Sequence, residues 1–208
     1  MYKRQLLAKA EKQAALLTSI RQKSAKAIEK EMKGRLIPLG IPNVRFEIAF
    51  AEKPLSGNGA DKVSFLFSAN KSTQLQPVSQ VASGGEIARV MLSLKAMISG
   101  AVKLPTIIFD EIDTGVSGKI AEKMADIMEE MGLQNRQVLS ITHLPQIAAM
   151  GRHHYKVLKE ETPQGTRSHM TELTEEQRVS EIAQMLSGSD ITEAALANAQ
   201  ELLRSYRK

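Results

Sequence analysis

The residues with the clearest chemical potential are two adjacent carboxylates, Asp110 and Glu111, which directly follow the apolar run at residues 107–109. A short, continuous apolar run after Pro105 predicts a strand that is buried on both faces of a parallel sheet. Two carboxylates at the end of such a strand are costly unless a cation or a proton transfer uses them. The simplest alternative is a strand that ends in solvent. We favour a site for a cation or for acid–base chemistry.

A histidine follows the next predicted strand. Residues 138–141 form a second apolar run just before His143, and the segment between the two runs has one apolar helical face, formed by Ile120, Met124, Ile127 and Met131. A strand, a helix and a strand of this size predict a βαβ unit with a right-handed crossover. Parallel strands point the same way, so Glu111 and His143 are expected at one sheet edge, where open α/β sheets bind ligands. A lone histidine near Pro145 is usually structural, but the shared edge favours contact with a phosphate or a water.

A glycine-rich turn, Ser83-Gly84-Gly85-Glu86, precedes both strands. Apolar residues follow it at helical spacing, namely Ile87, Val90, Met91, Leu94, Met97 and Ile98. Ser83 and Glu86 therefore predict a capping box at the start of a helix. A cap does not explain Gly84 and Gly85, because glycine weakens the first turn of a helix. The glycines supply accessible backbone N–H groups at a positive helix end, which suit a phosphate.

These three motifs resemble those of the ATP-binding-cassette (ABC) ATPases, specifically the SMC-like branch with long coiled-coil arms. Residues 83–86 resemble the signature motif, residues 107–111 the Walker B strand, and His143 the switch histidine. The resemblance extends to the RecN family of bacterial DNA-repair proteins and covers nearly the whole chain. It lies in the C-terminal helices and in five tracts, residues 39–46, 65–70, 81–86, 109–118 and 142–148.

The resemblance implies an α/β fold: the C-terminal half of an ABC-type ATPase head, with a mixed sheet, flanking helices and an antiparallel hairpin, preceded by a coiled-coil helix. It implies ATP and Mg²⁺ as ligands, and ATP hydrolysis at a head–head interface during DNA double-strand-break repair by recombination. By position, Asp110 would hold Mg²⁺ through a water, Glu111 would orient and deprotonate the attacking water, and His143 would contact the γ-phosphate. The ATP of a second head would be bound by the signature residues Ser83, Gly84, Gly85 and Glu86.

Two departures from the ABC pattern concern the residues around these motifs. Ala82 precedes the signature serine, where transporters usually have leucine. Ser117 stands where many ABC proteins carry the aspartate of the D-loop. Asp113 is the candidate substitute, and with it a candidate nucleotide-binding residue, so the turn is assigned only loosely.

A Walker A loop is missing from the sequence. Such a loop needs Gly, four residues and then Gly-Lys-Ser/Thr, so that backbone N–H groups and a lysine surround the phosphates. The only Gly-Lys pair, Gly118-Lys119, is followed by Ile120 and has Asp113 at the leading position. In the SMC-like branch the Walker A half lies at the far N-terminal end. We therefore expect a C-terminal segment that is inactive alone, whose partners are the N-terminal half of the same head and a second head in a homodimer.

Residues 1–33 predict the end of a coiled-coil arm, with residues 34–208 as the C-terminal lobe of the head. A heptad seam of modest hydrophobicity runs through Leu6, Ala10, Leu17, Ile20 and Ala27. The alternative is an ordinary amphipathic helix packed on the domain. Gly34 is expected to end the helix. Because a sheet without its Walker A strand exposes edges and apolar surface, we also expect self-association.

The remaining segments predict two antiparallel strand pairs and two final helices. The pairs are residues 44–50 with 63–67, and 155–158 with 168–173, and a polar linker covers residues 71–80. Thr174 and Gln177 predict a capping box, with Gly188 as the helix end. Asp190 and Glu193 are expected to open the last helix. The other histidines, His153, His154 and His169, lack metal-site spacing and are interpreted as surface or strand residues.

Composition bounds the remaining possibilities. The net charge is +5, and much of the excess lies in the N-terminal helix, as expected either for a solvated coiled-coil face or for backbone contact with DNA. The chain has no tryptophan and 4% aromatic residues, so it is poorly supplied for base stacking. It has no cysteine, no signal peptide and no membrane span, which fits a cytoplasmic, nucleoid-associated bacterial protein without membrane contact.

Two alternative functions remain open. One is the ATPase subunit of a transporter. The coiled-coil segment and the positive net charge of the chain argue against it. The other is a structural head that dimerises without turnover, against which the intact pair Asp110 and Glu111 counts.

Overall fold

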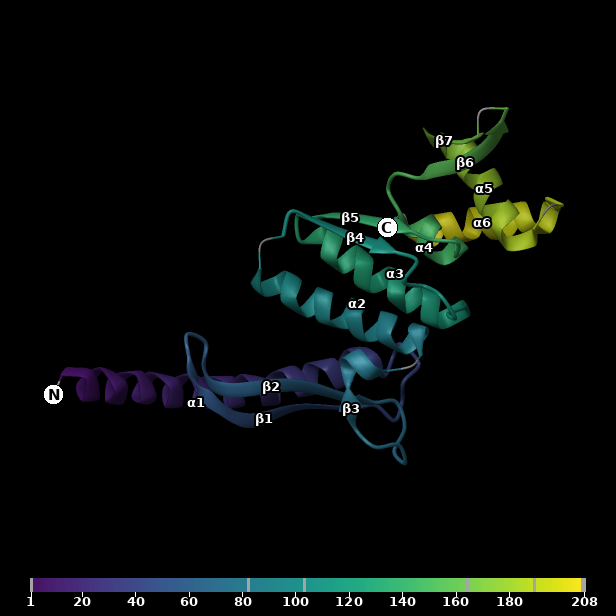
Figure 1. The fold of residues 1–208 in the computed structure, drawn as a ribbon. Helices are drawn as coiled ribbons and strands as arrows, with labels where there is room; N and C mark the ends of the chain where they lie inside the picture. Colours follow the sequence, from purple (N-terminus) through teal and green to yellow (C-terminus); the bar gives the residue numbers. More distant parts are fainter. Residues whose placement is uncertain (1, 82, 103, 164, 189, 207–208) are drawn as a thin grey trace. The chain divides into compact units, whose positions relative to one another are not determined.

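The computed structural model of the chain describes residues 2–81, 83–102, 104–163, 165–188 and 190–206. Within these residues it is a mixed α/β structure, as expected, but the strands form three separate sheets of three, two and two strands rather than one mixed sheet. The chain divides into two compact units, Met1–Lys95 and Ala96–Lys208. Figure 1 labels the elements along the chain. Among the described residues, no helix combines the length and the apolar character needed to cross a membrane.

The first unit is a long helix beside an antiparallel hairpin. Its helices and strands are α1 (Tyr2–Leu36), β1 (Arg45–Ser56), β2 (Gly59–Ser68), β3 (Gln76–Pro77), the 3₁₀ turn η1 (Val78–Gln80) and the start of α2 (Gly84–Ala101). The expected antiparallel pairing is confirmed: Phe46 pairs with Phe67 across the hairpin and both are buried, whereas Val63 and Phe65 on β2 are 36% and 42% exposed. The segment predicted as a polar linker contains β3, which pairs with β2 at Leu66 and Phe67, and η1.

Two faces of α1 have different surroundings. Its buried residues, Ala14, Ala25, Met32 and Leu36, recur at helical spacing where α1 runs along the hairpin (Figure 1). On this face the Thr18 hydroxyl donates to the Asp61 carboxylate at 2.8 Å, and the Arg21 guanidinium pairs with Asp61 at 3.1 Å. The seam residues Leu6 and Ile20 are 48% and 54% exposed. The buried face agrees with the alternative of an amphipathic helix packed on the domain, and the coiled-coil interpretation of the exposed seam stays a prediction.

The predicted end of this helix is wrong. Gly34 lies inside α1, which continues to Leu36, because the fully buried Met32 and Leu36 hold the last turn against the unit. The chain reverses at Gly40, where φ is +81° and a side chain would be strained. The Ile41 N–H then donates to the Leu36 carbonyl at 3.2 Å, as a helix end requires.

The predicted apolar face of α2 is also partly wrong. Val90 is buried as expected, but Met91 and Ile98 are 42% and 48% exposed. Leu92, Ser93, Ala96 and Ser99 are buried instead. Serine is tolerated there because its hydroxyl bonds the helix backbone: Ser93 donates to the Arg89 carbonyl at 2.8 Å and Ser99 to the Ala96 carbonyl at 2.7 Å.

The second unit begins with the predicted βαβ arrangement. It comprises β4 (Thr106–Asp110), α3 (Gly118–Leu133) and β5 (Gln137–Ile141), followed by the short helix α4 (Pro145–Met150), which the sequence analysis did not anticipate. The strands β4 and β5 are parallel, with Thr106 opposite Gln137 and Asp110 opposite Ile141. The inner side of α3 is buried at Ala121, Met124, Ala125, Met128 and Met131.

The expectation that β4 is buried on both faces is wrong for this chain. Ile107 and Phe109 are buried, whereas Ile108 between them is 57% exposed. On β5, Leu139 and Ile141 are 43% and 55% exposed. The sheet has two strands and is covered on one face, so its alternate side chains form an exposed apolar face, defined here by Ile108, Leu139 and Ile141.

A second hairpin and two helices complete the second unit. They are β6 (Tyr155–Thr162), β7 (Gly165–Glu172), α5 (Glu175–Ser187) and α6 (Glu193–Ser205). The core formed by α4, α5 and α6 contains Ala149, Ile182, Ala183, Ala195, Ala199 and Leu203.

The caps of these two helices test the predicted boundaries. The Thr174–Gln177 capping box is confirmed, and Gly188 with φ +79° ends α5. The N-cap of α6 is Thr192 rather than Asp190. The helix starts at Glu193, and the Thr192 hydroxyl accepts from the Ala195 N–H at 3.1 Å.

Candidate functional site

The ends of β4 and β5 form one edge, as the βαβ pattern predicts. Beyond β4, the Glu111 N–H donates to the Ile141 carbonyl at 3.1 Å and extends the ladder by one residue. Asp110 and Glu111 are both exposed at this edge. Glu111 has φ +45°, in the left-handed region where a side chain is strained. Such strain is common at functional sites, where the surrounding structure holds the residue in place.

The loops that follow the two strands are joined through Asp113. Its side chain is 1% exposed, and its carboxylate oxygen Oδ2 accepts a hydrogen bond from the Thr142 hydroxyl. The other oxygen, Oδ1, lies 3.6 Å from Nδ1 of His143, whose side chain is 64% exposed. Thr142 Oγ1 in turn accepts from the Leu144 N–H at 3.0 Å. The contact between the loops therefore passes through side chains from both.

Four predicted site residues of the second unit thus lie at the ends of one strand pair, three of them on the loops that follow the strands. Glu111 and His143 share the expected edge, and Asp110 is the last residue of β4. Asp113 was predicted as a substitute for the D-loop aspartate; its carboxylate is turned to Thr142 and His143 of its own chain. Ser117, at the usual D-loop position, is exposed and precedes α3.

Sequence reasoning missed Thr142. A signal was present, since a threonine just after a strand commonly accepts from the backbone N–H two residues on, as Thr142 does from Leu144. That pattern predicts an ordered turn. It does not predict that the hydroxyl hydrogen is directed at an aspartate from another loop.

The signature turn belongs to the first unit. Ser83 Oγ accepts from the Glu86 N–H at 3.4 Å, which is one half of the predicted capping box, and the Ser83 carbonyl accepts from the Ile87 N–H at 3.1 Å. Helix α2 starts at Gly84, where an added Cβ would meet nothing within 4 Å. The first turn of α2 therefore combines N–H groups without helical partners and open space beside Gly84.

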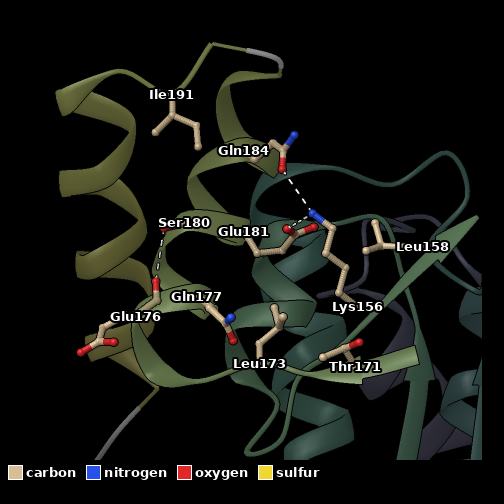
Figure 2. A pocket seen from close by; sticks show the side chains of 10 residues that line it. All are labelled: Lys156, Leu158, Thr171, Leu173, Glu176, Gln177, Ser180, Glu181, Gln184 and Ile191. Carbon is tan, nitrogen blue, oxygen red and sulfur yellow. Dashed lines mark hydrogen bonds and ion pairs between the residues drawn. The ribbon is translucent and has the colours of Figure 1, made fainter. Parts of the chain in front are cut away.

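A hollow of about 490 Å³ lies elsewhere in the second unit, between the β6–β7 hairpin and α5 (Figure 2). Lys156 reaches into it from β6, but its ammonium is held by Glu181 and by the Gln184 side chain, the latter at 3.4 Å. None of its ten lining residues is a predicted site residue. Its position and its lining do not match the chemistry predicted for the strand ends.

The described residues contain no group of three or more His, Asp or Glu side chains arranged to hold a metal ion. His153 and His169 pair with Glu172 and Glu160 at 2.8 and 3.2 Å, and both are exposed, as interpreted from the sequence.

Comparison with known proteins decides between the families that share such an edge. No family model matches the chain. It is 40% identical over 192 residues to the DNA repair protein RecN of Haemophilus influenzae, covering 91% of the chain and 34% of that protein. It is 40% identical over 188 residues to the RecN protein of Deinococcus radiodurans, a match that covers 90% of the chain and 33% of that protein. It is 36% identical over 208 residues to the RecN protein of Bacillus subtilis, a match that covers 92% of the chain and 36% of that protein. The chain is therefore similar to a segment of these RecN proteins over about nine tenths of its own length. It spans about a third of the length of the curated relatives it matches.

Solved structures with the same fold are heads of SMC proteins. The Smc head domain of Pyrococcus yayanosii, solved with a coiled coil and joint, has a TM-score of 0.60 at 19% identity over 82% of the chain and 31% of that protein. A chain from work on ATP-driven dimerization and DNA-stimulated activation of SMC ATPases has a TM-score of 0.54 at 19% identity, covering 83% of the present chain and 99% of its own. The chain thus shares its fold with these SMC heads over most of its length.

Proposed function

We propose that the chain supplies the signature-motif and Walker B part of an ATP-hydrolysing head that acts in DNA double-strand-break repair by recombination. The observation that carries this proposal is the shared edge, where the Glu111 backbone is bonded to β5 and His143 follows the same strand. The homology to RecN proteins, which are named as DNA repair proteins, supplies the process.

The residues at this edge fit a nucleotide with Mg²⁺. Asp110 is exposed at the end of β4 and would hold Mg²⁺ through a water, in keeping with the small number of protein ligands that this ion needs. When bound, Mg²⁺ neutralises the charge that develops on the phosphate oxygens. The exposed carboxylate of the next residue, Glu111, then does not have to coordinate the metal.

In this scheme Glu111 orients the attacking water and accepts its proton. The bond from its N–H to the Ile141 carbonyl fixes where the residue stands relative to β5. His143, with a 64% exposed side chain, donates to a γ-phosphate oxygen from its ring. Ser83, Gly84 and Gly85 bind the γ-phosphate of a nucleotide on a second head through the start of α2. Phosphoryl transfer depends mainly on such positioning and charge neutralisation.

The scheme requires partners. The sequence holds no Gly-x₄-Gly-Lys-Ser/Thr loop, so we infer that an N-terminal segment with Walker A completes the head and that this chain alone does not hydrolyse ATP. That segment would also cover the apolar face at Ile108, Leu139 and Ile141. The second head would be another copy. DNA would be contacted through its phosphates, in the bacterial cytoplasm at the nucleoid.

The test is ATP hydrolysis by this chain mixed with the separately expressed N-terminal half. We expect turnover only in the mixture, with losses of about 100-fold or more for Glu111→Gln, the size of a general base contribution, and for Ser83→Arg, which blocks the helix start. Glu129→Gln, exposed on α3, is the matched control and should retain full activity. A mixture that assembles but never hydrolyses ATP would instead support the structural head that dimerises without turnover.

A further inference from the structure

The carboxylate of Asp113 is buried in a way that its local role does not explain. Its main chain closes the turn, with the Val116 N–H donating to the Asp113 carbonyl at 3.2 Å, and Oδ2 takes the Thr142 hydroxyl. Among the described residues, the second oxygen, Oδ1, has no hydrogen-bond partner although the atom is inaccessible to solvent. A buried carboxylate oxygen without a partner costs free energy. A carboxylate that served only to fix the turn would need only one of its two oxygens.

One ring nitrogen faces this oxygen. Nδ1 of His143 stands 3.6 Å from Oδ1, within ion-pair range but slightly too long for a hydrogen bond. The His143 side chain is largely exposed, so a small rotation of the ring closes that distance, as catalytic contacts often do once a ligand is bound. With Nδ1 turned toward Asp113, Nε2 is the nitrogen left for a ligand.

We propose that Asp113 is a positioning residue for His143. Its carboxylate, fixed by Thr142, holds Nδ1 and thereby aims Nε2 outward; when both ring nitrogens carry protons, Nε2 donates to a phosphate oxygen. The loop after β4 and the loop after β5 then act as one unit. The kinetic consequence rests on the proposed ATPase function, whereas the orientation of the ring does not.

The decisive experiment reads the ring directly in the 208-residue chain. With ¹⁵N-labelled histidine, long-range ¹H–¹⁵N correlation reports which nitrogen of the neutral ring carries the proton, and His143→Gln assigns the His143 signals. In the native chain the proton should lie on Nδ1, facing the carboxylate. In Asp113→Asn the amide oxygen takes the Thr142 hydroxyl and the NH₂ group faces Nδ1, so the proton should move to Nε2.

The chain offers a matched control. Glu172 lies 2.8 Å from Nδ1 of His153 at an exposed pair. Glu172→Gln should alter the His153 signals and leave those of His143 unchanged. If Asp113→Asn does not fold, Thr142→Val serves in its place: it removes the hydroxyl that fixes Oδ2, and His143 should lose its single tautomer, whereas Thr142→Ser should keep it.

Kinetic measurements on the variants separate a positioning role of Asp113 from a purely structural one. In the mixture that hydrolyses ATP, Asp113→Asn should lower kcat by about 10- to 100-fold, the usual cost of a misplaced group, and the double variant with His143→Gln should be no slower than His143→Gln alone. Losses that multiply in the double variant, or a His143 tautomer unchanged by Asp113→Asn, would overturn the proposal. If the mixture has no turnover at all, the proposed function fails, and the tautomer measurement still decides the role of Asp113.

Discussion

The Glu111 N–H donates to the Ile141 carbonyl at 3.1 Å, although Glu111 itself has already left the strand with φ +45°. The hydrogen bond continues the parallel ladder for one residue while the backbone turns away from it. The Thr114 hydroxyl adds a bond to the Glu111 carbonyl at 3.0 Å. The exposed carboxylate is thus placed by main-chain bonds rather than by packing, and its backbone conformation carries a strain that another residue type would avoid.

The strain at Glu111 predicts an unusual stability ranking. Glycine adopts a left-handed conformation without penalty, so Glu111→Gly should be more stable than Glu111→Ala by about 1 kcal/mol. Denaturant unfolding of both variants measures the difference. On the exposed side of α3, Glu129→Gly should instead be less stable than Glu129→Ala by about 1 kcal/mol, because glycine weakens a helix. Equal stability of the two Glu111 variants would show that the backbone is unstrained.

Local signals in the sequence predicted local structure well. The Thr174–Gln177 box formed as expected because both partners lie within one helical turn. The parallel pairing of β4 and β5 followed from two apolar runs and a helix between them. The common edge of Glu111 and His143 then required no further information, because strand direction alone determines it.

The sequence-based predictions were wrong where contacts between residues far apart in the sequence determine the structure. Gly34 should end a helix by propensity, but burial of Met32 and Leu36 carries α1 past it. Ile108 should be buried by its pattern, yet the chain covers only one face of its sheet. The link from Asp113 to Thr142 joins residues 29 positions apart through a side chain whose direction no local pattern specifies. Sequence therefore predicted which elements carry the site, but not the contact that joins its loops.

Arg178 should be the most costly polar residue to replace in the second unit. Its side chain is 6% exposed, and its guanidinium donates to the carbonyls of Ala149 at 3.3 Å, Arg152 at 3.2 Å and Gly151. Burial lowers its pKa, but the group remains a cation. Arg178→Met removes the donors to these carbonyls and should destabilise the chain by about 3 kcal/mol in denaturant unfolding.

The control for this prediction is the ion-pair partner of Arg178. Glu175 lies 3.3 Å from it but is 62% exposed, so Glu175→Gln should change stability by less than about 0.5 kcal/mol. A comparable loss in both variants would mean that the ion pair, rather than the bonds to the carbonyls, holds α5 to the loop after α4.

Tyr206 should make the stability of the chain fall at high pH. Burial raises its pKa to about 12, with added contributions from Asp126, Glu122 and Glu129 on α3. The unfolded chain loses this proton near the usual value of about 10, so the stabilisation is complete below pH 10 and is lost as the pH rises toward 12. Tyr206→Phe should flatten this decline. The difference in phenolate absorbance between the two proteins gives the midpoint, and a midpoint near 10 would contradict the prediction.

The exposed lysines of α1 should bind DNA through its phosphates. Lys23 and Lys30 are exposed, whereas Arg21 is held by Asp61 at 3.1 Å and by the Asn58 carbonyl at 3.0 Å. Replacing both lysines by glutamine should weaken binding equally for unrelated duplexes and reduce the slope of log affinity against log salt by about 2. Fluorescence anisotropy over a range of salt measures both effects. Lys123→Gln on α3, where Lys123 pairs with Asp126 at 2.8 Å, is the control.

The exposed apolar face of the β4–β5 sheet predicts self-association of the chain in solution. Ile108, Leu139 and Ile141 lie on neighbouring strands and are 43–57% exposed, which is unusual for adjacent β-branched and leucine side chains. Light scattering should give a mass above 22.9 kDa, with binding of a hydrophobic dye. Replacing Ile108 and Ile141 by threonine keeps β propensity while lowering hydrophobicity, so it should shift the chain toward monomer.

Val157 on β6 tests whether this effect is specific to that sheet. It is 61% exposed on the β6–β7 hairpin, so Val157→Thr removes similar apolar surface elsewhere and should leave the mass unchanged. A monomeric native chain without dye binding would contradict the prediction. Addition of the N-terminal half should suppress dye binding by the native chain, because the same face cannot bind both the dye and a covering segment.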